Sequence, residues 1–200
     1  MPMYIQGKKS NILLFFQAIL ACVFAVFCFF VAPHYSFAAS LLVSPNSGNY
    51  NVGDSFSVSI YTTSTEQALN ALSGRINYPS DKLSVTSVSK ASSIVNFWTI
   101  DPGEYSSEPG VMRFEGIVLN PGYKGSRGTI FTITFKVKAQ GTAPVNFLSA
   151  SVLANDGKGT NILASVRDGT YVLGPVGSEF TTEEAGKGLP QAPQVISSTH

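Results

Sequence analysis

Apolar and polar residues alternate with a period of two along most of the chain between Ser40 and Gly174. In the clearest run, residues 131–138, Phe, Ile and Val alternate with Thr and Lys. Similar alternation occurs at 55–60 and at 112–118. A period of two places the apolar side chains on one face, as a half-buried antiparallel strand requires. The pattern therefore predicts strands rather than helices in this region.

Turns rich in Pro, Gly, Asn and Asp separate the alternating runs, for example at 45–48 and 155–157. Short strands bounded by such turns are typical of a β-sandwich or barrel. A helical turn is expected only at 65–71, where it would be a connection and not a layer. Counting the runs between turns predicts nine strands, near 40–44, 54–62, 72–78, 83–89, 94–101, 111–119, 128–139, 144–153 and 162–173.

The first 38 residues predict a signal peptide. Two lysines precede an uncharged and largely apolar run, 10–31, and the small residues Ser36 and Ala38 stand where a signal peptidase would cut, so that the mature chain begins at Ala39. The alternative is a retained N-terminal anchor, because an apolar run of about 20 residues can cross a bilayer. In both cases the body is expected outside the cytoplasm, extracellular or at the cell surface. It would contact a membrane only through an uncleaved N-terminal segment.

The chain changes character after Gly174. Residues 175–200 lose the apolar periodicity and carry Pro175, Pro190 and Pro193, a composition typical of a flexible linker. A linker at this position leads us to expect either further modules beyond residue 200 or a truncated sequence. The predicted organisation is a signal segment at 1–38, a sandwich at 39–174 and a linker at 175–200.

The composition excludes several classes of chemistry from the body. Only 12% of the residues are charged and the formal net charge is +1. The chain therefore lacks the concentrated basic surface that a nucleic-acid-binding protein needs. Cys22 and Cys28 both lie in the N-terminal run, and no histidine occurs between Tyr35 and Thr199. Cysteine nucleophiles, Ser-His-Asp triads, disulfides and zinc sites are therefore excluded there. We expect no metal and no cofactor.

Two acidic segments deserve comparison with catalytic and calcium sites. A glycosidase needs two carboxylates facing each other across a sugar. Asp101, Glu104, Glu108 and Glu115 fall close together in sequence, but solvated turn positions account for them better. The segment 155–159 could offer oxygen ligands to Ca²⁺, but it lacks regular acidic spacing and contains a lysine. We therefore expect no enzymatic activity, and a hydrolase is the weakest alternative.

Several motifs follow one another in a fixed order from Leu41 to Gly174. They are Tyr50 to Val58 with Gly53-Asp54, Ile76 to Val85 with Tyr78-Pro79, Gly128 to Lys138, Ala150 to Gly157, and Asp168 to Gly174. Each motif alone is common among sandwiches. In their order and spacing across about 135 residues, they resemble the motifs of a cohesin domain.

The resemblance implies a nine-stranded antiparallel β-sandwich with jelly-roll topology and no catalytic centre. It further implies that one flat sheet face binds a dockerin-like protein, here through the strands near 72–78, 94–101, 111–119 and 144–156. Ala71, Ser73, Pro79 and Asn155 depart from residues that are frequent in the family, so the contact pattern is kept less well than the scaffold. The residues predicted to bind the partner are Arg75, Asn77, Asn96, Trp98, Asn155 and Asp156.

Two other functions fit the same sandwich. A carbohydrate-binding module would use a row of exposed aromatic rings to hold a polysaccharide, and Trp98 with Tyr50, Tyr105 and Tyr123 are the candidates. Trp98 is also suited to filling a gap in the core, because large aromatic side chains bury well. A structural adhesion or surface-layer domain would instead pack its face against a neighbouring domain.

Overall fold

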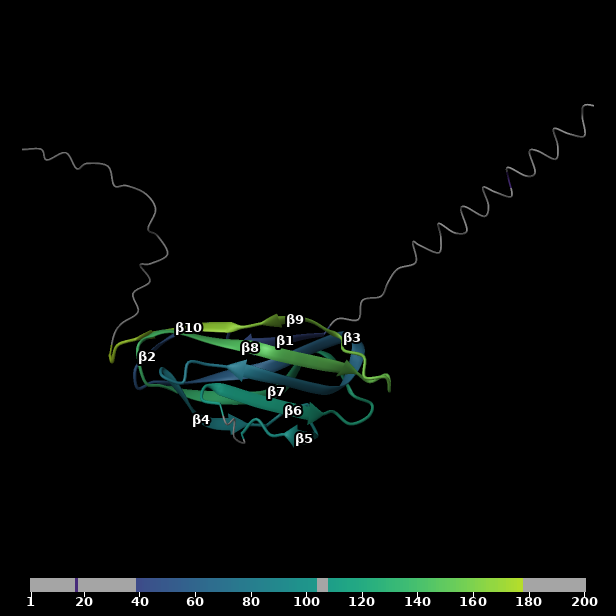
Figure 1. Cartoon of the computed structure of the whole chain (residues 1–200), viewed down its shortest axis with the longest axis horizontal. Coiled ribbons are helices and arrows are strands. Elements are labelled where there is room, and N and C mark those ends of the chain that lie inside the picture. Colours follow the sequence, from purple (N-terminus) through teal and green to yellow (C-terminus); the bar gives the residue numbers. More distant parts are fainter. Residues whose placement is uncertain (1–16, 18–38, 104–107, 178–200) are drawn as a thin grey trace, which may run out of the picture. The chain divides into compact units, whose positions relative to one another are not determined.

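The computed structural model describes Gln17, residues 39–103 and residues 108–177 (Figure 1). The predicted signal peptide, apart from Gln17, and the predicted linker beyond residue 177 lie outside the described residues. Within the described part of the chain, no helix has the length and apolar character needed to cross a membrane.

Residues 39–103 and 108–177 form strands, turns and bends, with no helix. The predicted all-β sandwich is therefore confirmed. There are ten strands in this described part: β1 (Ala39–Ser44), β2 (Ser47–Asn51), β3 (Ser55–Asn77), β4 (Leu83–Ser89), β5 (Phe97–Ile100), β6 (Val111–Ile117), β7 (Tyr123–Val137), β8 (Gly141–Ala154), β9 (Leu163–Arg167) and β10 (Gly169–Gly174).

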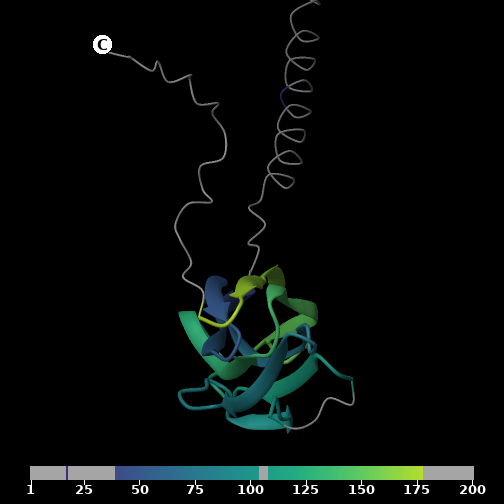
Figure 2. The same ribbon diagram turned by 90° about the vertical axis from the view of Figure 1, so that its left-hand side faces the viewer.

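The strands make two layers that share β3, and Figure 2 views these layers end on. The first part of β3, 55–64, pairs with β1 and β7, which gives one layer in the order β9-β1-β3-β7-β4. The last part, 69–77, pairs with β8 and β6, which gives a second layer in the order β2-β10-β8-β3-β6-β5. Because β3 is hydrogen-bonded in both layers, it fixes the position of one relative to the other.

The strand count and two details of the prediction are wrong. The helical turn expected at 65–71 is part of β3, where the register shifts between Ser64 and Leu69 and the Ser64 hydroxyl donates to the Gln67 carbonyl over 2.5 Å. The run 162–173 divides into β9 and β10, and the turn region after Pro45 contains β2. The sheet is also not wholly antiparallel, because β1 pairs with β9, and β2 with β10, in parallel.

The core consists of the apolar side chains that alternate along the strands. Phe114 and Phe131 meet edge to face with ring centroids 5.1 Å apart, and both are almost fully buried. Tyr171 is fully buried as well, and its hydroxyl donates to the Pro45 carbonyl over 2.6 Å. This bond ties β10 to the link between β1 and β2, where the chain passes from one layer to the other.

The outer side of the first layer is lined with hydroxyl groups. Ser57 lies opposite Thr134 with their hydroxyl oxygens 3.1 Å apart, and Ser59 lies opposite Thr132 at 2.8 Å. We call this surface, formed by these four residues on β3 and β7, the hydroxyl face. Its side chains satisfy one another across the strands, and this arrangement suits contact with water.

Candidate functional site

The outer side of the second layer differs from the hydroxyl face. We call the outward surface of β8, the last part of β3, β6 and β5 the 8-3-6-5 face. These are the four strands expected to carry the partner-binding surface, and the structure places them side by side. Strand register aligns their outward residues in four rows. In the order β8, β3, β6, β5 these are Leu153, Ala71, Ile117 and Phe97 (the apolar row); Ser151, Ser73, Glu115 and Ile100 (the glutamate row); Ser149, Arg75 and Arg113 (the arginine row); and Asn146, Asn77 and Val111 (the amide row).

Arg75 and Asn77 lie on this face, two residues apart on β3, as their spacing predicted. The Arg75 guanidinium donates to the Glu108 carboxylate over 2.6 Å, and its Nε is buried without a hydrogen-bond acceptor in the described residues. Arg113 lies directly opposite Arg75 on β6, is exposed, and forms no ion pair within the described part of the chain. Two cations therefore share one row.

The predicted residues Asn96 and Trp98 have inward or local contacts. The Asn96 side-chain oxygen accepts the Leu119 N–H over 3.0 Å, so this residue fixes the start of β5 against the end of β6. Trp98 is half-buried and packs against the core, with its ring centroid 6.1 Å from that of Phe131. Its neighbour Phe97 points outward and is 59% exposed. The aromatic ring that β5 exposes is thus Phe97, which the sequence analysis did not select.

Asn155 and Asp156 lie after the end of β8, beyond the apolar row. The Asn155 amide donates to the Pro121 carbonyl over 2.8 Å. The Asp156 carboxylate accepts the Thr160 hydroxyl over 2.5 Å and the Lys158 N–H over 2.9 Å, and these hydrogen bonds, in that order, hold the pKa of Asp156 below its usual value. Both predicted residues therefore shape turns at one end of the 8-3-6-5 face.

Exposed apolar side chains gather on or beside the 8-3-6-5 face. Phe97, Ile117, Leu119 and Leu148 are all at least 38% exposed, and none of the large apolar residues exposed in the described chain belongs to β7 or the first part of β3. Ile117 could have been found from the sequence, because the alternation that buries Met112 and Phe114 turns it outward. Leu148 could not, since a register shift in β8 exposes it.

A shallow depression of about 260 Å³ lies in the middle of the 8-3-6-5 face. Its floor is formed by backbone and small side chains of β3 and β8, and the two arginines of the arginine row and Glu115 line it. Because β3 carries Gly74 on the inner side, the Phe114 ring can lie directly beneath the floor. The depression can accept a side chain of moderate size from a partner.

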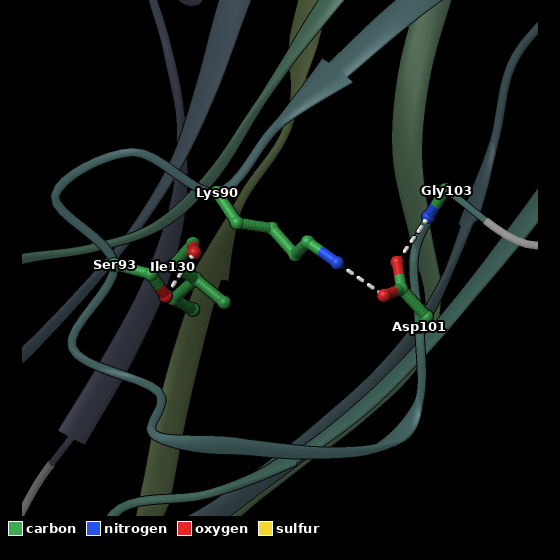
Figure 3. A network of polar contacts seen from close by, with 5 residues as sticks. All are labelled: Lys90, Ser93, Asp101, Gly103 and Ile130. Carbon is green, nitrogen blue, oxygen red and sulfur yellow. Dashed lines mark hydrogen bonds and ion pairs between the residues drawn. The ribbon is translucent and has the colours of Figure 1, made fainter.

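A network of polar contacts holds β5 in place (Figure 3). Lys90, just after β4, forms an ion pair with Asp101, just after β5, and Asp101 also accepts the Gly103 N–H over 2.9 Å. The hydrogen bond from Lys90 is the main cause that keeps the pKa of Asp101 below its usual value. Ser93 lies between Lys90 and Asp101 in the sequence, and its hydroxyl donates to the Ile130 carbonyl over 2.6 Å. The Lys90–Asp101 pair therefore joins the two ends of the segment that carries Phe97, and the Ser93 hydrogen bond ties this segment to β7.

The acidic residues considered for catalysis have separate environments. Asp101 is paired with Lys90, Glu108 with Arg75, and Glu115 stands exposed on the 8-3-6-5 face. Glu104 lies outside the described residues. In the described part of the chain, no three His, Cys, Asp or Glu side chains gather as a metal site would require.

Three of the four rings considered for sugar stacking, those of Tyr50, Trp98 and Tyr123, are packed against the core and come from different elements. Tyr50 stacks on Phe56 with ring centroids 4.0 Å apart, and Tyr123 and Trp98 also pack on the core. Tyr105 lies outside the described residues. These packed rings do not supply the flat exposed row that polysaccharide binding was expected to use.

The comparison with protein families identifies the fold. The sequence model of the cohesin domain family matches residues 41–172. The chain belongs to the cohesin family. Its all-β sandwich is accordingly of the jelly-roll type, as predicted. No curated protein sequence matches this cohesin.

Solved structures with the same fold include cohesins of different settings. A type I cohesin from a cohesin–dockerin complex of Clostridium thermocellum is 15% identical, with a TM-score of 0.58 over 72% of this chain and 99% of that chain. A non-cellulosomal cohesin from the hyperthermophilic archaeon Archaeoglobus fulgidus is 18% identical, with a TM-score of 0.54 over 74% of this chain and 95% of that chain. The seventh ScaB type I cohesin of Pseudobacteroides cellulosolvens is 20% identical, with a TM-score of 0.53 over 73% and 98%. At these identities the likeness is one of fold.

Proposed function

We propose that this cohesin is an exported, non-catalytic recognition module that binds a dockerin-like protein through the 8-3-6-5 face. The observation that carries the proposal is the difference between the two outer surfaces. The hydroxyl face satisfies its own polar groups, whereas the 8-3-6-5 face exposes Phe97 and Ile117 in one row and two arginines in another. Exposed aromatic residues and arginines are the side chains enriched in the centres of protein interfaces.

The mechanism would be surface complementarity on a rigid support. The segment that carries Phe97 is held by the contacts of Lys90, Ser93 and Asp101, and the Arg75 side chain is held by Glu108. Fixed side chains lose little conformational entropy when a partner binds, which favours affinity. Arg75 and Asn77 would contact the partner directly. Asn96, Trp98, Asn155 and Asp156, also predicted as binding residues, would contribute mainly by positioning β5 and the turn after β8.

The proposed interaction takes place outside the cell or at the cell surface. This location requires that the N-terminal segment directs export. Its two lysines, apolar run and small residues support this. The C. thermocellum cohesin with the same fold was crystallised with a dockerin, which supports a dockerin-like partner here. The A. fulgidus cohesin with this fold is non-cellulosomal, so the fold alone does not favour a polysaccharide-degrading assembly. Polysaccharide binding by the chain itself finds less support, since Tyr50, Trp98 and Tyr123 pack on the core.

The test is a binding array of the purified chain against every dockerin module encoded in its source genome, with insoluble cellulose and chitin as parallel ligands. We expect retention of at least one dockerin, and Phe97→Ala to weaken it by at least about 30-fold, as a central aromatic contact would. Val166→Ala, which trims a residue 43% exposed on β9 in the other layer, is the control and should bind normally. Retention on the polysaccharides alone, or no dockerin retained, would overturn the proposal.

A further inference from the structure

The outward residues of β6 carry three different chemistries in succession. Ile117 is apolar and 38% exposed, Glu115 is an exposed acid, and Arg113 is an exposed base. Glu115 and Arg113 form no ion pair with each other or with any other described residue. Outward residues of one strand are spaced by about 6.8 Å, twice the rise per residue. The face therefore presents an apolar group, a negative charge and a positive charge at equal steps along a line of about 14 Å.

The arginine row carries two positive charges that are only partly neutralised within the described residues. Arg75 and Arg113 lie directly opposite each other on neighbouring strands, where strands are about 4.8 Å apart. Like charges in this position repel and disfavour the folded state. Glu108 neutralises Arg75 through one guanidinium nitrogen, while Arg75 Nε is buried without an acceptor in the described chain and Arg113 remains exposed. An additional carboxylate over this row would relieve the repulsion.

The depression between the rows fits such a carboxylate. It is lined by both arginines, by Glu115 and by the hydroxyl-bearing residues Ser73, Ser149 and Ser151. Guanidinium groups bind carboxylates through paired N–H donors, and hydroxyls can donate further hydrogen bonds. Its volume of about 260 Å³ is enough for an acidic side chain rather than for a whole sugar chain.

We propose that the partner of this cohesin presents an apolar, a basic and an acidic side chain in this order along β6, spaced as positions i, i+4 and i+8 of a helix are. The proposal rests on the function proposed above and names the chemistry of its partner. The apolar residue would face Phe97 and Ile117, the base Glu115, and the acid Arg113 beside Arg75. Four helical residues rise about 6 Å, close to the spacing of the rows, and residues four apart lie on one helix face. The flat side of a sheet has no free backbone edge for an added strand, so a helix is the element that fits it.

Charge-swap binding measurements test this inference on the dockerin that the array retains most tightly. Arg113→Glu should weaken binding at least about 30-fold, because it replaces an attraction by a repulsion at a contact that excludes water. Replacing the partner's acid at i+8 by Lys should recover binding to within about tenfold. Glu115→Lys, with the partner's base changed to Glu, should behave in the same way. Lys136→Glu on β7 changes the charge equally on the opposite layer and should have no effect.

The outcomes separate this inference from the function on which it rests. If Phe97→Ala abolishes binding while Arg113→Glu does not, the 8-3-6-5 face is the binding surface but the charge series is overturned. If Arg113→Glu weakens binding and no partner acid restores it, the carboxylate contact is overturned as well. If no dockerin is retained at all, the proposed function fails and the inference falls with it. A melting temperature for each variant within about 3 °C of the parent would confirm that the fold is intact.

Discussion

Gly74 offers the sharpest test of how the inner side of the sheet supports the outer one. It lies on β3 between Ser73 and Arg75, with its inner side against the Phe114 ring. A methyl group added at Gly74 would stand 2.6 and 2.7 Å from two ring carbons of Phe114 and 3.2 Å from the Ser149 carbonyl oxygen. Carbon atoms in contact are normally about 3.5–4.0 Å apart, so the ring would have to move by about 1 Å. Phe114 cannot move alone, because it contacts the fully buried Phe131.

The Gly74→Ala variant should therefore be less stable. Overpacking of a core costs about 1–3 kcal/mol, and removing a flexible glycine from a strand returns about 0.5–1 kcal/mol. We expect a net loss of about 1–2 kcal/mol in the free energy of unfolding, measured by urea denaturation of the full chain. Ser73→Ala, on the outward side of the same strand, is the control and should change stability by less than about 0.5 kcal/mol.

A second substitution checks the cause. Phe114→Leu in the Gly74→Ala background makes room for the methyl group, so the two changes together should cost about 1 kcal/mol less than the sum of their separate effects. A Gly74→Ala chain as stable as the parent would refute the packing argument. So would strictly additive effects of the two substitutions.

Further results are expected from two polar contacts, those of Tyr171 and Asp101. Tyr171→Phe removes the hydroxyl that donates to Pro45 and should cost about 1–2 kcal/mol in a urea titration, with the fold retained. Burial raises the pKa of Tyr171 above its usual value, so the unfolded chain releases this proton first and stability should fall as the pH rises above about 10, less steeply in Tyr171→Phe. Asp101→Asn should lower stability by about 0.5–1 kcal/mol at pH 7 through loss of the Lys90 ion pair. Because the pKa of Asp101 is lowered on folding, its contribution is present above pH 4 or so and disappears below; a difference between parent and variant that persists at about pH 2 would contradict this assignment.

The alternation of residue types was enough to predict most strands and the outward side of two of them. Arg75 and Asn77 share a face because they are two apart on a strand, and this needs no tertiary information. The separation of 54–62 and 72–78 into distinct strands failed because continuity of hydrogen bonding through 65–71 depends on partners distant in sequence. The short β2 and β9 lack a clear alternation, and only pairing with other strands defines them.

The orientation of the candidate side chains was harder to predict than the strands, and β5 shows why. Trp98 turns inward, yet Ile100, two residues later, lies on the outer face beside Glu115, because the register shifts between them. A bulge of this kind reverses the side on which later residues lie, and it leaves no clear mark in a four-residue strand. Asn96 and Asn155 are polar, and the sequence alone suggests that their side chains are available to a partner. In the structure, however, the Asn96 side chain accepts the Leu119 N–H and the Asn155 side chain donates to the Pro121 carbonyl. Sequence patterns identify which residues are polar, and only the fold decides whether these groups are already satisfied.

The parallel pairing of β1 with β9 and of β2 with β10 sets the direction in which the chain passes through the sandwich. Ala39 lies beside Leu163 at the start of β9, and Asn51 lies beside Gly174 at the end of β10, so β1 begins and β10 ends at opposite ends of the sandwich (Figure 1). The twelve positions from Leu163 to Gly174 span about 40 Å. If several copies of this domain were joined end to end, the connections would lie at the ends of each sandwich and not over its sheet faces. Each copy would then be able to bind a partner independently, and the number of bound partners would increase with the number of copies.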